Sequence, residues 1–178
     1  MNGYELWIDV AVVAGAALVL PVTAPDGRRA WPVVAACAAV GLVLAPSPLA
    51  GVLATPWLAV ALWLVAGSLR QEVRVLRTPG RLTMDGWLRS AGVVAVPAWA
   101  AVAGAALVDT CVGHQWLGFD EPILRLTVVH FTFVGAGATT LALAALAARP
   151  RSVRRVGLVL VLVAPPIVGL GFTSGAAV

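Results

Sequence analysis

The stretch that decides the fold is Leu49–Asp85, which reads LAGVLATPWLAVALWLVAGS and then LRQEVRVLRTPGRLTMD. Its first part, Leu49–Ser68, carries no charged residue, and a helix needs about 20 such apolar residues to cross the hydrocarbon core of a bilayer. Its second part carries four arginines. Cytoplasmic connections accumulate arginine because moving a cation across a membrane is unfavourable. The stretch therefore predicts a membrane-spanning helix whose end faces the cytoplasm.

The whole chain has the composition of a membrane protein. Of its 178 residues 61% are hydrophobic and 11% are charged, whereas a soluble domain carries about 25% charge. Its mean hydropathy is +0.97. We expect an all-α, polytopic membrane protein in which residues 1–178 form one domain, a six-helix transmembrane bundle. The expected spans, the second of them short for a full crossing, are Leu6–Thr23, Trp31–Leu44, Leu49–Ser68, Trp87–Val108, Pro122–Ala148 and Val156–Ala176.

All twelve cationic side chains are arginines, and their distribution predicts the orientation. Ten of them fall in the first, third and fifth connections: Arg28, Arg29, Arg70, Arg74, Arg77, Arg81, Arg149, Arg151, Arg154 and Arg155. Both termini should then lie outside the cytoplasmic membrane of a bacterium. The same distribution accounts for a sequence pI near 10.5. Because no aromatic and basic stripe accompanies the charge, we expect no nucleic-acid partner.

This orientation collects polar side chains at the outer ends of the spans, where we expect the function to lie. They are Glu5, Asp9, Asp109, His114, Asp120, Glu121, Arg125 and His130. Tryptophans near the predicted span ends fit an aromatic belt at the membrane interfaces: Trp7, Trp31, Trp57, Trp87 and Trp116. The cysteines and histidines do not have metal-ligand spacing, so we expect neither a metal nor a cofactor.

The most informative polar segment is residues 118–133, GFDEPILRLTVVHFTF. Glu121 precedes a proline that suits a first helical turn, and it stands four residues before Arg125, so the two can pair along one face. His130 lies about 12 Å into the span, where an ionisable residue is a functional candidate by default. The hydroxyl of Thr127, three residues earlier, is a candidate hydrogen-bond partner for the His130 ring. The alternatives are helix capping, a surface ion pair, and a histidine bonded to a neighbouring carbonyl.

A second candidate lies in the first span. Glu5 and Asp9 are four residues apart and share a helix face, so their charges repel. Asp9 has entered the apolar run between Ile8 and Val10. Burial and a neighbouring carboxylate both favour the protonated form of an acid, and a protonated Asp9 is a candidate general acid. The alternative is an interfacial acid that sets orientation.

The same polar segment resembles the signature of the YndJ-like family of bacterial membrane proteins. The likeness rests on GFDEPI at residues 118–123 and LTVVHF at 126–131. The resemblance implies that Glu121, Thr127 and His130 occupy positions of the family's motif. A weaker likeness covers Leu20-Pro21 and the span at residues 54–69. The family pattern has a second histidine where this chain has Thr132, which weakens a two-histidine metal site. The family is often labelled a transporter.

Three functions fit these observations. The first is an integral membrane enzyme that applies acid–base catalysis to a lipophilic substrate, with a terpenoid epoxide or alkene cyclase as the specific candidate and Asp9, Glu121 and His130 as catalytic residues. The residues expected to bind its substrate are Glu5, Trp7, Asp109, Trp116, Asp120, Arg125 and Thr127. The alternatives are a small-molecule transporter of the YndJ-like type and a non-catalytic membrane assembly or interaction protein. Expected partners are the lipophilic substrate and membrane lipids, and a second copy of the chain is a further candidate.

Overall fold

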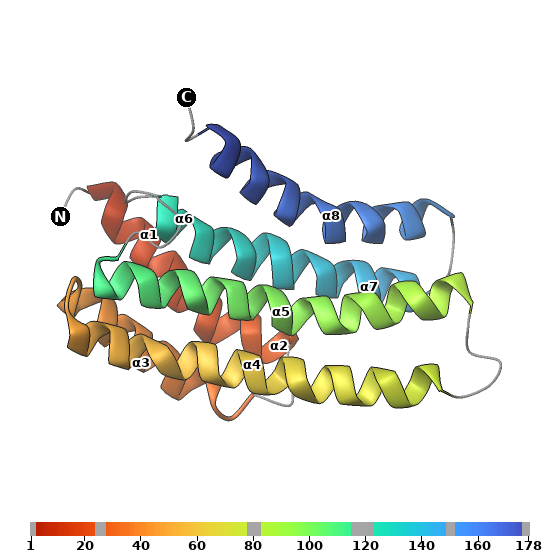
Figure 1. Cartoon of the computed structure of the whole chain (residues 1–178), viewed down its shortest axis with the longest axis horizontal. Coiled ribbons are helices and arrows are strands. Elements are labelled where there is room, and N and C mark those ends of the chain that lie inside the picture. The colour runs from red at the N-terminus through yellow and green to blue at the C-terminus, as the bar shows by residue number, and fades with distance from the viewer. Residues whose placement is uncertain (1–2, 24–27, 78–82, 115–122, 149–151, 176–178) are drawn as a thin grey trace.

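The computed structural model describes residues 3–23, 28–77, 83–114, 123–148 and 152–175, and within them it is a bundle of helices without strands (Figure 1). Two of the long helices contain a π-helical segment, labelled η. The elements in chain order are α1 (Gly3–Ala14), η1 (Gly15–Val19), α2 (Leu20–Thr23), α3 (Trp31–Leu44), α4 (Pro48–Leu76), α5 (Met84–Val112), α6 (Ile123–His130), η3 (Phe131–Gly137), α7 (Ala138–Ala148) and α8 (Ser152–Gly175).

Four helical stretches of the described chain are long and apolar enough to cross a membrane. They are Glu5–Thr23, Pro48–Val75, Met84–Val112 and Ile123–Ala148. The α3 helix, with 14 residues, is about 21 Å long and falls short of the hydrocarbon thickness. The all-α class and the short second span are therefore confirmed, and a sixfold crossing stays a prediction.

The long helices extend beyond their predicted ends. The prediction ended one helix at Ser68, but α4 continues to Leu76, and α5 begins at Met84 and not at Trp87. Hydropathy indicates where the apolar part of a helix ends. The helix itself continues for as long as its backbone N–H and C=O groups can form hydrogen bonds within the helix. The Ser47 hydroxyl caps the start of α4 by accepting from Ala50 N at 3.1 Å. Gly113, with φ 76°, ends α5 in the left-handed region that favours glycine.

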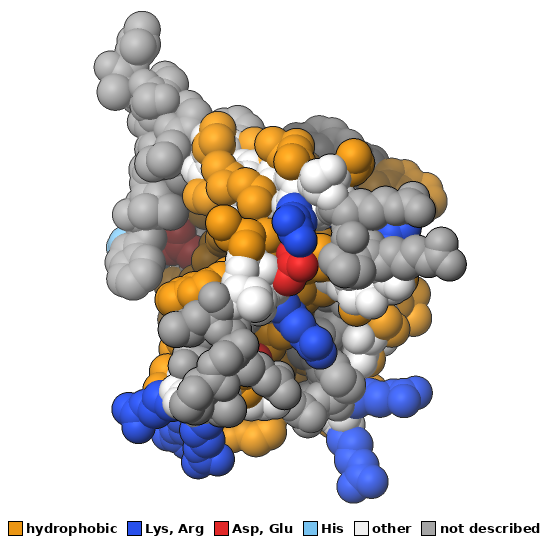
Figure 2. All heavy atoms as spheres, turned by 90° about the vertical axis from the view of Figure 1, so that its right-hand side faces the viewer, with side chains coloured by type: hydrophobic (Ala, Val, Ile, Leu, Met, Phe, Trp, Pro, Cys, Tyr) orange, Lys and Arg blue, Asp and Glu red, His pale blue; other side chains and the backbone are white. Residues whose placement is uncertain are grey.

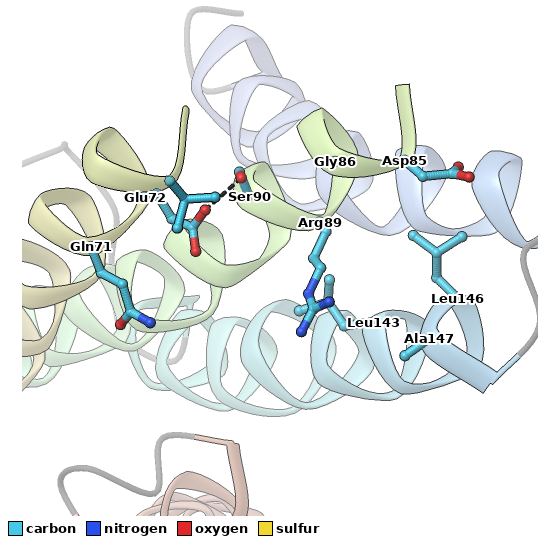
Figure 3. Close-up of a pocket in the computed structure, with 10 residues that line it drawn as sticks. Gln71, Glu72, Asp85, Gly86, Arg89, Ser90, Leu143, Leu146 and Ala147 are labelled. Carbon is cyan, nitrogen blue, oxygen red and sulfur yellow. Dashed lines mark hydrogen bonds between the residues drawn. The ribbon is translucent and has the colours of Figure 1, made fainter. Parts of the chain in front are cut away.

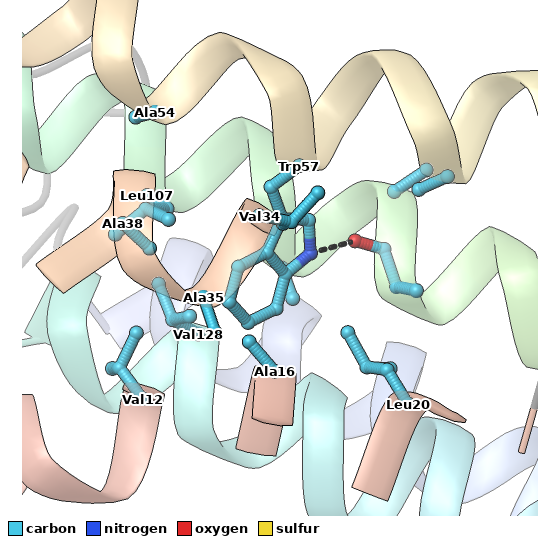
Figure 4. Packing of buried hydrophobic residues seen from close by; sticks show 14 of the residues in the cluster. Val12, Ala16, Leu20, Val34, Ala35, Ala38, Ala54, Trp57, Leu107 and Val128 are labelled. Carbon is cyan, nitrogen blue, oxygen red and sulfur yellow. Dashed lines mark hydrogen bonds between the residues drawn. The ribbon is translucent and has the colours of Figure 1, made fainter. Parts of the chain in front are cut away.

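The core lies between the α1–α2 segment, α3, α4, α5 and the α6–η3 segment, and Trp57 lies within it (Figure 4). Trp31 and Trp57 are fully buried and meet edge to face, with ring centroids 6.3 Å apart. Trp57 Nε1 donates to the carbonyl of Ala100 at 2.9 Å. A Cβ at Gly104 would lie 2.7 Å from the Trp57 ring, so α4 and α5 pack closely here.

This core corrects the predicted aromatic belt. Trp31 and Trp57 pack against each other in the interior, and neither is exposed on the surface as an interface anchor would be. Trp7 and Trp87 are 73% and 54% exposed, as interface anchors should be.

The end of α4, the start of α5, the end of α7 and the start of α8 lie at one end of the bundle, and the start of α1 lies toward the other (Figure 1). Figure 2 looks onto the first of these ends, where arginine side chains project around the rim. The helix ends that flank the arginine-rich third and fifth connections of the sequence therefore share one end of the molecule. We call it the arginine-rich end.

Candidate functional site

The first feature of the site is an ion pair between α1 and α6. Arg125 Nη1 donates to both carboxylate oxygens of Asp9, at 3.0 and 3.1 Å. The two side chains are only 17% and 15% exposed. An ionised group that is removed from water is destabilised unless an opposite charge lies beside it. This contact therefore joins the first span to the fifth. The sequence predicted both residues as part of a site but did not predict this pairing.

The second feature is a histidine set among aromatic rings. The His130 ring meets Phe131 edge-on at 5.3 Å, and Phe131 lies 5.5 Å from Trp99 of α5, measured between ring centroids. His130 Nε2 and Trp99 Nε1 are both buried, and neither has a hydrogen-bond partner among the residues that the structure describes. A buried polar atom without a partner costs free energy, so each is available to a group that enters.

Asp9 and His130, which the sequence predicted to line one site, have different interaction partners in the structure. Arg125 and His130 are five residues apart on the same α-helix, which places them about 140° apart around its axis. Arg125 therefore faces Asp9 on α1, whereas His130 lies beside the aromatic pair that joins the fifth span to α5. Helical phase is the reason that one segment serves two different neighbours.

The third feature is a contact between two π-helical segments, η1 and η3. A Cβ at Gly15 of η1 would lie 2.7 Å from Thr132 Cγ2 of η3, and one at Gly137 would lie 3.4 Å from Val19 Cγ1. Thr132 is fully buried, and its hydroxyl donates to the carbonyl of Val128. π-helical turns are rare and occur mostly at functional positions. The sequence analysis missed them, and the only signal was the small residues at 15–17 and 135–138.

Asp109 lies near the end of α5 that is opposite the arginine-rich end. The α5 helix continues past it to Val112, and Asp109 is 9% exposed. His114, just after α5, is largely exposed, and its Nδ1 lies 3.7 Å from Asp109 Oδ1. This pair adds a second acid and base to that end of the bundle.

The other predicted binding residues stand as follows. Thr127 donates to the carbonyl of Ile123 at 2.8 Å, so its hydroxyl proton serves its own helix. Trp7 is exposed on α1, and Glu5 lies one helical turn before Asp9. Trp116, Asp120 and Glu121 lie outside the described residues. Among the residues described, no three of the histidine, cysteine and acidic side chains come together as a metal site.

A cavity of about 410 Å³ lies at the arginine-rich end, away from all of these groups (Figure 3). It opens between the last turns of α4, the first turns of α5 and the end of α7. The sequence analysis used this region only to assign sidedness. The polar residues that line the cavity, which it did not propose as site residues, are Gln71, Glu72, Asp85, Arg89 and Ser90.

Comparison with known families agrees with the polar segment. A family model described as YndJ-like protein matches residues 12–178. The chain belongs to the YndJ-like family. No curated protein and no solved structure matches it. The match includes Arg125 and His130, whereas Asp9 precedes it.

Membership in the YndJ-like family gives Thr132 a particular interest. This is the position at which the resemblance noted in the sequence implies a second histidine, and here it holds the fully buried contact with Gly15. An imidazole is larger than a threonine side chain, and a Cβ at Gly15 would already meet Thr132 too closely. This YndJ-like chain therefore uses the position for packing between its π-helical segments.

Proposed function

We propose that this YndJ-like protein is a membrane enzyme that acts on a lipophilic small molecule by proton transfer, with His130 as the base. The observation that carries the proposal is the buried Nε2 of His130, which has no hydrogen-bond partner in the described part of the chain, beside the Phe131 and Trp99 rings. A neutral imidazole in such a place can take a proton from a reacting group. The aromatic faces attract a cation that forms before that proton leaves.

Cyclisation of a polyprenyl epoxide is the reaction that uses these groups best. A carboxylic acid protonates the epoxide oxygen, the C–O bond breaks, and an alkene attacks the new cation to form a C–C bond. The ring cation then loses a proton to His130, so substrate and product are isomers and no co-reactant is needed. Both oxygens of Asp9 are bound to Arg125, so we assign the donor role to Glu121 and a positioning role to Asp9.

The test uses purified protein in lipid nanodiscs with the terminal epoxide of farnesyl acetate as the probe. Products are separated by gas chromatography and identified by mass spectrometry as cyclic isomers. We expect His130→Gln, which keeps a polar group but is no base at neutral pH, to lower turnover by about 10²–10⁴-fold. His114→Gln is the matched control at an exposed histidine. Full activity of His130→Gln, or no cyclic product from the native protein, would refute the proposal.

A transporter is the second candidate, and the contact between η1 and η3 favours it. Transporters place irregular helices where they face one another within the membrane. If Gly15 and Thr132 separate during transport, a Gly15→Cys/Thr132→Cys disulfide should stop uptake into proteoliposomes reversibly, and cyclase activity should survive it. Uptake that is unaffected by the disulfide would leave the enzyme as the better account.

A further inference from the structure

The cavity at the arginine-rich end has an unusual balance of charge. Asp85 is neutralised by Arg155, whose Nε lies 2.6 Å from Oδ1 and whose Nη2 donates to Oδ2 at 2.9 Å. Glu72 accepts the Ser90 hydroxyl at 2.5 Å. Arg89 lines the same cavity and has no hydrogen bond or ion pair with any residue in the described part of the chain.

One carboxylate and one guanidinium therefore face the same space without pairing with each other. A purely anionic ligand would be repelled by the Glu72 carboxylate, and a purely cationic ligand would be repelled by the Arg89 guanidinium. A ligand that carries both charges satisfies both groups and keeps the cavity neutral. Arginine binds phosphate through parallel N–H donors, and a carboxylate accepts from an ammonium group.

The remaining walls are apolar and come mainly from α7. Arg89 reaches from α5 toward α7 and lies beside Leu143 (Figure 3). Leu143 packs into the space that Gly92 leaves, since a Cβ there would lie 2.6 Å from Leu143 Cδ2. Leu146 and Val75 continue the apolar lining. Polar groups above an apolar wall fit an amphiphile better than a solute that is polar throughout.

We propose that this cavity binds the phosphoethanolamine headgroup of a membrane phospholipid, with Arg89 on the phosphate and Glu72 on the ammonium group. The arginine-rich end is where the chain should meet the cytoplasmic headgroups, and basic pockets between membrane helices on that side are known to take lipid heads. The acyl chains would follow the apolar face of α7. The site is independent of the chemistry proposed for His130.

Native mass spectrometry of the full-length protein in detergent tests the site directly. The protein is given equal amounts of phosphatidylethanolamine and phosphatidylglycerol, which share a phosphate but differ in the ammonium group. We expect the first lipid to be retained in preference. Arg89→Gln and Glu72→Gln should each lower its retention by about tenfold, as expected for loss of one charge-assisted hydrogen bond.

Three variants and one competitor make the result decisive. Arg70→Gln removes an exposed cation of α4 that does not line the cavity and should change nothing, whereas Arg89→Lys should restore part of the binding. Wild-type retention by Arg89→Gln, which is on the surface and should fold, would overturn the site. A preference for phosphatidylglycerol would contradict the proposal that the ligand carries an ammonium group as well as a phosphate. If soluble glycerophosphoethanolamine binds as tightly as the lipid, the headgroup chemistry holds and the lipid source is wrong.

Discussion

Arg125 on α6 holds both carboxylate oxygens of Asp9 on α1 through a single nitrogen, at 3.0 and 3.1 Å, across 116 residues of sequence. Both side chains are mostly buried, so each charge depends on the other for its solvation. The contact sits where the first and fifth spans meet, one helical turn and more before the π-helical segments of both. It is therefore the element most sensitive to a change of charge.

We expect Asp9→Asn and Arg125→Gln each to lower stability by about 3–5 kcal/mol, because each leaves a buried charge without its counterpart. The double variant should lose less stability than the sum of the two single losses, since neither charge of the pair remains in it. Chemical denaturation of the detergent-purified protein, followed by circular dichroism, measures the three values. Additive losses would show that the pair is not coupled, and that Asp9 and Arg125 are stabilised by other neighbours.

The η1–η3 contact gives a second prediction. Gly15→Ala should lower stability by about 1–3 kcal/mol, because the new Cβ would lie 2.7 Å from Thr132 Cγ2. Thr132→Ser removes that methyl group and keeps the hydroxyl, so it should rescue Gly15→Ala in the double variant.

The matched control for this pair is Gly67→Ala in α4, where a Cβ would meet nothing within 4 Å. It should be neutral or raise stability by about 0.5–1 kcal/mol through helix propensity. The thermal unfolding midpoints of the wild type, Gly15→Ala, the Gly15→Ala/Thr132→Ser double variant and Gly67→Ala provide the measurement. Equal effects at positions 15 and 67 would mean that the π-helical segments are not closely packed.

The tryptophan core predicts a contrast between two residues of α4. Trp57→Phe removes the Nε1 donor and leaves the buried Ala100 carbonyl with one partner fewer, so it should cost about 1–3 kcal/mol. Trp63→Phe, at a position 64% exposed, should cost under about 0.5 kcal/mol. The unfolding midpoints of the two variants provide the measurement, and similar midpoints would contradict the assignment of Trp57 to the core.

Orientation in the membrane is open to direct test by thiol labelling. In a background with Cys37 and Cys111 replaced by serine or alanine, Ser152→Cys near the arginine-rich end should be shielded from an impermeant thiol reagent in intact cells. His114→Cys, at the other end of α5, should react. The reverse pattern would place both termini in the cytoplasm and the His130 region at the inner half of the membrane.

The class of protein and the approximate positions of its helices could be predicted from the amino-acid sequence. Hydropathy alone marks an apolar span, because every backbone group in a bilayer must bond within its own segment. For this reason Trp31–Leu44 was predicted with its observed bounds, and the arginines of the α4–α5 and α7–α8 connections were assigned to one side. The polar segment with Arg125 and His130 was also evident from the sequence.

Which groups contact one another depends on how the helices pack. Arg125 faces Asp9 while His130 faces an aromatic pair, because helical phase directs residues five apart to different neighbours. Burial of Trp57, and the gathering of Glu72 and Arg89 around one cavity, depend on how α4, α5 and α7 pack. Hydropathy is a property of each segment alone, whereas these contacts join distant segments, so no single segment of the sequence could specify them.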